Sequence, residues 1–261
     1  MSAEPVDFLG NYLRSVSHLA TRPGETPRSS IAISRESGAG ALTVAMLVAE
    51  KLNVEFPGDP PCSWTVLDQN LVSKILEDHN LSKRIEEFMP ENMRFPLTES
   101  LEFLLGLHPR SGLLRQYAKD TIRKLAIIGN VVLIGRGAAV ITAGLPYVLR
   151  VRLVAPFDCR VQNFARSHGI TEEKAVRIVR ANDAAHRRFV RAYLNADVTD
   201  VLHYNLVINT GSNGFEGAAQ IICAAVEDLV LQESRRKPTA PSGAENNGAS
   251  GSGRRSERLV R

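Results

Sequence analysis

The chain has few cysteines, few aromatic residues and no long apolar run. Its three cysteines are Cys62, Cys159 and Cys223 among 261 residues, and none forms a C-x-x-C pair with another. An odd, widely spaced set excludes the common zinc and dithiol motifs and favours a reducing compartment. No apolar run reaches the roughly 18 residues of a membrane-spanning helix. No charged and then apolar leader opens the sequence, so we expect a cytoplasmic protein without membrane insertion.

The positive charge is concentrated near one end of the chain. The net charge of +4 and the pI near 9.1 suit an anionic partner. Much of the excess lies in residues 233–261, whose Gly, Ser, Pro and Asn content predicts a disordered basic tail. This tail has no aromatic side chains for base stacking, so we expect a nucleic-acid partner at most weakly and through the tail. A solvated tail is the favoured interpretation.

Between the ends, apolar runs typical of buried strands alternate with helical patterns. The runs are "IAIS" at 31–34, "WTVL" at 64–67, "VVLIG" at 131–135, "YVLRVRLV" at 147–154 and "NLVIN" at 205–209. Alternating strands and helices predict a three-layer α/β/α fold with a five-stranded, mostly parallel sheet. We place this domain at 31–232, after an N-terminal helix and linker at 1–30.

Chemistry-bearing residues follow several of these strands. "RESGAGALT" follows the first strand, Asp68 the second, "GRGA" the third and "APFDCR" the fourth. Ligands of parallel sheets bind beyond the carboxyl ends of the strands. The sequence therefore predicts one site at this edge, built from glycine, acid and arginine.

The stretch "SGAGALT" has the composition of a phosphate-binding loop. Glycines permit the tight turn, and backbone N–H groups with the following helix N-terminus attract anions. The predicted phosphate-binding residues are Gly38, Ala39, Gly40, Ala41, Leu42 and Thr43. The standard pattern has lysine where Ala41 stands and Ser or Thr where Leu42 stands. A plain strand-to-helix turn is equally compatible with this loop, and Thr43 either caps the helix or lies near a magnesium-bound water.

Four stretches together resemble the cytidylate kinase-like family of P-loop proteins. They are "ISRESGAGALTVAMLVAEKL", "VLDQNLV", "VLIGRGAAVI" and the run from "VRLVAPFDCR" to "NLVINT". The resemblance implies a P-loop kinase-like fold, ATP and Mg²⁺ as cofactors, and a loop in which the lysine is commonly absent. It also implies that Arg136 holds the acceptor's phosphate and that residues 170–195 form a lid over the donor.

Several charged residues are candidates for the chemistry, each with a structural alternative. Arg35 is proposed to replace the lysine, or else it pairs with an acid such as Glu36. Asp68 faces the acceptor or the metal's water shell, or it caps the next helix. Arg136 alternatively forms a salt bridge at a strand end. Phosphoryl transfer needs convergent cations.

The predicted lid carries most of the remaining candidates. They are Arg180 as a catalytic residue and Arg177, Asp183 and Arg187 as further lid residues. A solvated basic helix face is the alternative. The histidines show no metal-ligand spacing, so the metal ligands stay unknown, and His168 and His186 are interpreted as lid surface.

Two functions remain open at this point. The first is a nucleoside monophosphate kinase-like phosphotransferase acting from ATP on a small phosphorylated acceptor such as CMP. The second is a catalytically inactive, nucleotide-binding regulatory or scaffold protein, which the apolar Ala41 and Leu42 favour.

Overall fold

The structure is a computed structural model that describes residues 28–55, 63–68, 119, 122–123, 125–135 and 137–236. Five strands make one sheet: β1 (Ser30–Arg35), β2 (Thr65–Asp68), β3 (Val131–Ile134), β4 (Val148–Val154) and β5 (Leu206–Asn209). The helices include α2 (Ala41–Glu55), α7 (Ala138–Ile141), α8 (Phe157–His168), α9 (Glu172–Leu194) and α10 (Thr210–Arg236), with a 3₁₀ turn at Val201–His203; residues 125–128 are also helical.

The sheet is parallel throughout, in the order β2-β3-β1-β4-β5. The central strands are buried on both faces, which explains their nearly continuous apolar sequences. From β1 the chain passes through α2 toward β2, whereas from β3 it passes through α7 to β4 on the other side. The connections therefore diverge between β1 and β3, and a ligand crevice forms at such a switch point.

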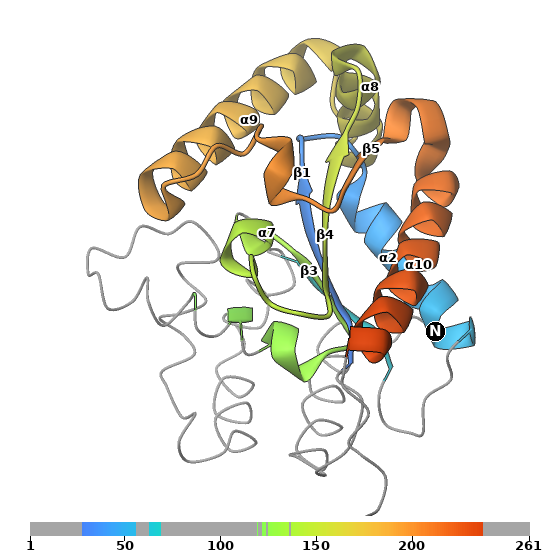
Figure 1. Ribbon diagram of the computed structural model, residues 1–261. Coiled ribbons are helices and arrows are strands. Elements are labelled where there is room, and N and C mark those ends of the chain that lie inside the picture. The colour runs from blue at the N-terminus through green and yellow to red at the C-terminus, as the bar shows by residue number, and fades with distance from the viewer. Residues whose placement is uncertain are drawn as a thin grey trace, which may run out of the picture.

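Helices cover both faces of the sheet and one of its ends. In Figure 1, α2 and α10 lie together on one face, α7 lies on the other, and α8 and α9 lie beyond the carboxyl ends of the strands. Helix α9 packs on α8 through Ala175 near its start, while Phe189 and Val190 near its end pack with Val140 of α7. Both ends of α9 are thereby anchored to neighbouring helices.

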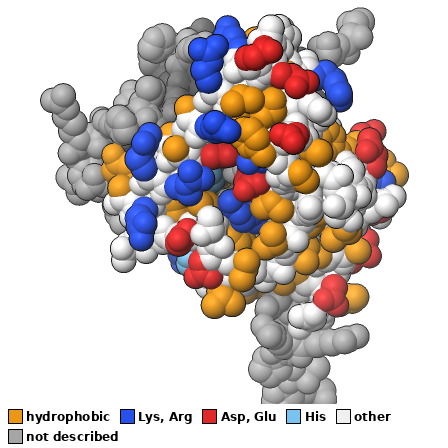
Figure 2. Space-filling view, turned by 90° about the horizontal axis from the view of Figure 1, so that it is seen from above, with side chains coloured by type: hydrophobic (Ala, Val, Ile, Leu, Met, Phe, Trp, Pro, Cys, Tyr) orange, Lys and Arg blue, Asp and Glu red, His pale blue; other side chains and the backbone are white. Residues whose placement is uncertain are grey.

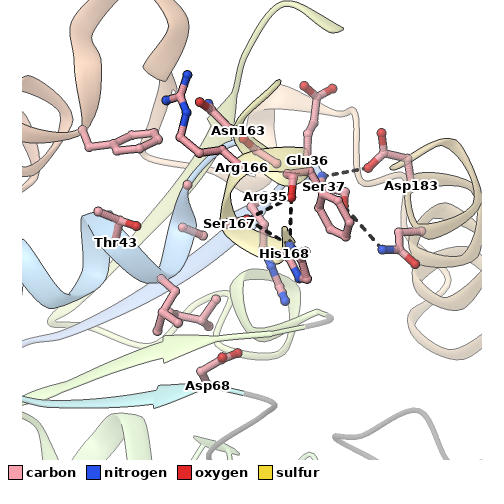
Figure 3. Close-up of a pocket in the computed structure, with 18 of the residues that line it drawn as sticks. Arg35, Glu36, Ser37, Thr43, Asp68, Asn163, Arg166, Ser167, His168 and Asp183 are labelled. Carbon is pink, nitrogen blue, oxygen red and sulfur yellow. Dashed lines mark hydrogen bonds between the residues drawn. The ribbon is translucent and has the colours of Figure 1, made fainter. Parts of the chain in front are cut away.

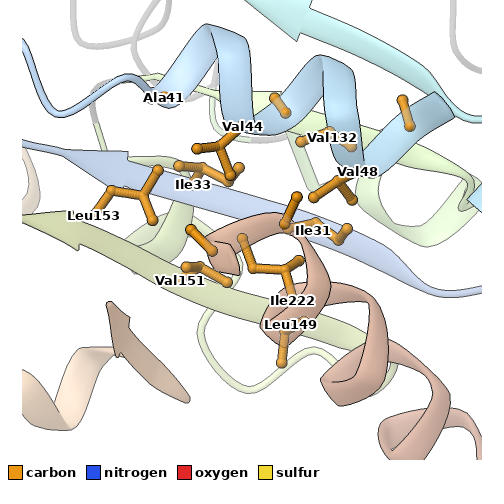
Figure 4. Close-up of a cluster of buried hydrophobic side chains, with 14 of the residues drawn as sticks. Ile31, Ile33, Ala41, Val44, Val48, Val132, Leu149, Val151, Leu153 and Ile222 are labelled. Atoms are coloured by element: carbon orange, nitrogen blue, oxygen red, sulfur yellow. The ribbon is translucent and has the colours of Figure 1, made fainter. Parts of the chain in front are cut away.

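The main core lies between the sheet and the α2–α10 pair (Figure 4). Ile31 and Ile33 of β1 and Leu153 of β4 are fully buried there against Val44 of α2 and Ile222 of α10. Burying a side chain of this size contributes roughly 1.5 to 3 kcal/mol. This layer fixes the start of α2, and with it the loop that joins β1 to α2.

The predicted three-layer fold with a five-stranded parallel sheet is confirmed. Each observed strand overlaps its predicted run, with ends that differ by about one residue. Helix α10 continues to Arg236, past residue 233 where the tail is predicted to start. The predicted N-terminal helix and the rest of the tail lie outside the described residues.

Candidate functional site

A cleft of 720 Å³ opens at the carboxyl ends of β1, β2 and β3 (Figure 3). Its floor includes Arg35, Asp68 and Ile134, the last residues of these strands. Its walls come from the β1–α2 loop, the second half of α8, the middle of α9 and Phe215 of α10. The convergence predicted from the strand ends is therefore present for β1 and β2.

The β1–α2 loop and the first turn of α2 line this cleft. Gly38 and Gly40 adopt positive φ angles of 82° and 79°. The first hydrogen bond of α2 runs from the N–H of Val44 to the carbonyl of Gly40. Among the described residues, none accepts a hydrogen bond from the N–H groups of Gly38 or of residues 40–43. Unsatisfied N–H groups at a helix start form the type of site that binds phosphate.

Packing against neighbouring helices explains why both loop positions are glycine. A Cβ atom on Gly38 would lie 2.2 Å from the carbonyl oxygen of Arg160. One on Gly40 would lie 2.2 Å from the Phe215 ring. Close approach of the chain to a phosphate is therefore not needed to account for these glycines.

The first turn of α2 contributes no cation. Ala41 is buried, and Leu42 points partly to solvent with 48% of its surface exposed. Thr43 is exposed, and Ala39 is fully buried behind the loop. The positive charge that neutralises a bound phosphate would have to come from other elements.

Two arginines, Arg35 and Arg166, line the cleft. Arg35 ends β1, and Arg166 lies in the last turn of α8. The lid candidates Arg177, Arg180 and Arg187 are exposed and lie outside the lining of the cleft. The Arg180 guanidinium lies over the Phe157 ring, 5.1 Å from its centroid. Figure 2 shows basic side chains gathered at this end of the molecule, beside acidic ones that border a hollow.

Asp183 is the lid candidate that reaches the loop. Its Oδ1 accepts a hydrogen bond of 2.8 Å from the N–H of Ser37, and its Oδ2 lies 2.7 Å from an amino nitrogen of Arg160. Arg160 also lies 3.3 Å from Glu36 Oε2. Glu36 is thus paired with an arginine of α8.

Asp68 is nearly buried, with 7% of its surface exposed, and lines the cleft. The helix that it was expected to cap, and Arg136 of the "GRGA" stretch, lie outside the described residues. His168 is exposed, but it is the last residue of α8 rather than part of the lid, and it also lines the cleft. The expectation for His186 is wrong, because it is 9% exposed and lines the cleft from the inner side of α9.

Sequence patterns missed several residues of this site. Arg160 stands inside the quoted stretch "APFDCR", but nothing in its spacing distinguishes it from an exposed helix arginine. Asn163 and Arg166 follow it at helical spacing on the cleft side of α8. Phe215 follows Gly214, where α10 is kinked and φ is 67°, and this glycine was the one signal for it that the sequence offered.

The described residues contain no cluster of three or more His, Cys, Asp or Glu side chains that could hold a metal ion. No helix in the described part of the chain is long and apolar enough to cross a membrane.

Comparison with known proteins identifies the family. The profile of the cytidylate kinase-like family matches residues 30–212. The chain belongs to the cytidylate kinase-like family. It is 30% identical over 166 residues to a cytidylate kinase of Thermococcus kodakarensis, covering 63% of this chain and 82% of the relative. It is 26% identical over 203 residues to a cytidylate kinase of Methanothrix thermoacetophila, covering 76% of this chain and 98% of the relative.

Other similarities are shorter or concern the fold alone. The match to a cytidylate kinase of Methanocaldococcus jannaschii is 29% identical over 108 residues, 41% of this chain and 61% of that relative. The chain thus spans less than two thirds of the length of this relative. A crystal structure of an uncharacterized protein from Eubacterium ventriosum has a TM-score of 0.55 at 19% identity, covering 77% of this chain and 99% of the other. That likeness confirms the α/β fold.

Proposed function

We propose that this chain is a nucleoside monophosphate kinase-like phosphotransferase that moves the γ-phosphoryl group of ATP to a small phosphorylated acceptor such as CMP. One observation carries the proposal. Gly38 and residues 40–43 line a 720 Å³ cleft at the switch point of the sheet, and their N–H groups have no acceptor among the described residues. Membership of the cytidylate kinase-like family supports the nucleotide as ligand and the kinase reaction.

In the proposed reaction a phosphate oxygen of the acceptor attacks the γ-phosphorus. The bond from that phosphorus to the β,γ-bridging oxygen breaks, and ADP leaves with the electron pair. Most of the catalytic effect in such reactions comes from positioning and charge stabilisation. The loop amides would hold the β-phosphate, while Arg35 and Arg166 would neutralise charge from the floor and from the α8 wall.

The residues present fit a magnesium ion that accompanies ATP. Mg²⁺ usually needs only one or two protein oxygens besides phosphate and water. Asp68 and the Thr43 hydroxyl both line the cleft and would hold it. When bound, the ion would neutralise phosphate charge.

A second candidate is nucleotide binding without turnover. Ala41 and Leu42 at the start of α2 favour it, since neither supplies a donor or a charge. A coupled assay of ADP formation, with MgATP and each common nucleoside monophosphate in turn, separates the two candidates. We expect acceptor-dependent ADP formation. Tight ATP binding with no ADP formed from any acceptor would favour the second candidate, and absence of both would contradict each of them.

A further inference from the structure

Arg160, a residue of α8, joins the β1–α2 loop to α9. Its Nε donates to the carbonyl of Ala155 at 3.1 Å and lies 3.3 Å from Glu36 Oε2. One terminal nitrogen donates to the carbonyl of Ser37 at 3.1 Å and to Asp183 Oδ2 at 2.7 Å. The side chain is 9% exposed and lies outside the lining of the cleft. Its Nε and one of its terminal nitrogens are therefore engaged by protein groups rather than directed at a ligand.

The contact with the Ser37 carbonyl fixes the direction of the next N–H group. A trans peptide is planar, so the carbonyl oxygen of Ser37 and the N–H of Gly38 point in opposite directions. The oxygen points to Arg160, and the N–H of Gly38 therefore points away from it. Gly38 lines the cleft, and none of the described residues accepts a hydrogen bond from its N–H.

Asp183 holds the other side of the same residue. Its Oδ1 accepts the N–H of Ser37, while its Oδ2 binds Arg160 (Figure 3 shows the first contact). The neighbouring Asn182 donates to the Ser37 hydroxyl at 3.4 Å. Both peptide groups of Ser37 are thus held by α8 and α9, and α9 contacts the loop through this residue.

We propose that Arg160 and Asp183 are positioning residues, which aim the N–H of Gly38 into the cleft and couple the place of α9 to the loop. This inference rests on the proposed function, in which the loop amides bind phosphate. Neither residue needs to touch the nucleotide. Affinity for ATP would then depend on a buried arginine outside the cleft wall.

Positioning and charge make opposite predictions for these residues. Glu36, Asp183 and Arg160 together carry one net negative charge, which by itself disfavours a bound anion. If charge dominated, Asp183→Asn would strengthen ATP binding. If positioning dominates, Asp183→Asn keeps an acceptor for Ser37 and changes little, whereas Asp183→Ala removes it. Lysine at 160 keeps the charge but lacks the planar fork that makes several contacts at once.

The test uses the full chain and two readouts. Isothermal titration with MgATP gives the dissociation constant, and NMR amide hydrogen exchange at Ser37, measured without ligand, reports its hydrogen bond to Asp183. We expect Arg160→Lys, Arg160→Gln and Asp183→Ala each to weaken ATP binding at least tenfold and to speed up this exchange. Asp183→Asn should stay within threefold of the wild type. The control Arg150→Gln removes a guanidinium nearer the amino end of β4 and should leave both values unchanged.

The possible failures can be told apart. Faster exchange at Ser37 with unchanged ATP affinity would overturn the positioning role and leave the proposed function standing. If Arg160→Lys binds ATP as the wild type does and Arg160→Gln binds it weakly, the charge of residue 160 accounts for the loss of affinity. This result would also overturn the positioning role. If the Arg160 variants do not fold, the Asp183→Ala and Asp183→Asn pair decides. A wild-type chain that binds no MgATP would overturn the proposed function and this inference together.

Discussion

A Cβ atom added to Gly40 would lie 2.2 Å from Cε1 of Phe215. The loop after β1 and the kinked start of α10 therefore fit together only because residue 40 is glycine. This contact joins two segments that both line the cleft. It also means that a large residue at position 40 would damage the fold whether or not a phosphate binds there.

Gly40→Ala should destabilise the protein more than Gly169→Ala. Both glycines have positive φ angles, 79° and 62°, but a Cβ atom on Gly169 would meet no neighbour within 4 Å. The conformational cost alone is about 1 kcal/mol, and overpacking adds roughly 1 to 3 kcal/mol. Urea unfolding measures both. In a Phe215→Ala background the excess cost of Gly40→Ala should largely disappear; an undiminished excess would show that the ring is not its cause.

Arg35→Ala should lower turnover at least tenfold, about 1.4 kcal/mol of transition-state stabilisation, while the melting temperature of the ligand-free protein stays within a few degrees. The reason is that Arg35 lies on the floor of the cleft, where Ala41 and Leu42 provide no charge. Arg166→Ala should act in the same direction, because Arg166 lines the wall formed by α8. Steady-state kinetics and thermal unfolding check this. Lost stability with normal turnover would make Arg35 a structural residue.

Arg180 remains a predicted catalytic residue, although in this structure it stacks on Phe157 outside the cleft. If α9 moves to deliver it to ATP, Arg180→Ala should reduce kcat more than ATP affinity. Arg187→Ala is a useful comparison, since Arg187 is also exposed and outside the lining. Equal kcat in the wild type and Arg180→Ala would remove Arg180 from the chemistry and leave it an exposed stacking contact, worth about 0.5 to 1 kcal/mol.

Stability should fall in alkaline solution because of Cys223. Burial, followed by the nearby Glu55 carboxylate, raises the pKa of this thiol from 9.0 to about 11. Between these values the unfolded thiol loses its proton while the folded one keeps it, so the folded state binds more protons and its stability decreases as pH rises. Relative to Cys223→Ala, the wild type should lose roughly 2 kcal/mol between about pH 8 and pH 11. Urea unfolding at each pH measures the stability of both proteins. Equal losses of stability in the two would contradict the raised pKa.

The sequence predicts the sheet well because buried parallel strands such as Ser30–Arg35 and Val148–Val154 are nearly continuous apolar runs. It also predicts that Asp68 and the glycine loop lie at carboxyl ends of strands, since Asp68 ends β2 and the loop directly follows β1, while their roles toward a ligand stay predictions. It could not find Arg160, whose partners Ser37 and Asp183 are distant in sequence. Nor could it show that Arg180 lies on Phe157, since helical spacing gives a shared face but not what that face contacts.

The central claim is that backbone amides of the loop bind the phosphates of ATP. Two-dimensional ¹⁵N–¹H NMR of the full chain, titrated with MgATP, tests it most directly, because a phosphate oxygen that accepts an N–H bond shifts that amide resonance. We predict saturable shifts concentrated at Gly38 and at residues 40–43, with smaller changes at the amides of the exposed residues Val201 and Leu202. Saturable shifts elsewhere with the loop amides unmoved, or no shifts at millimolar MgATP, would contradict the account.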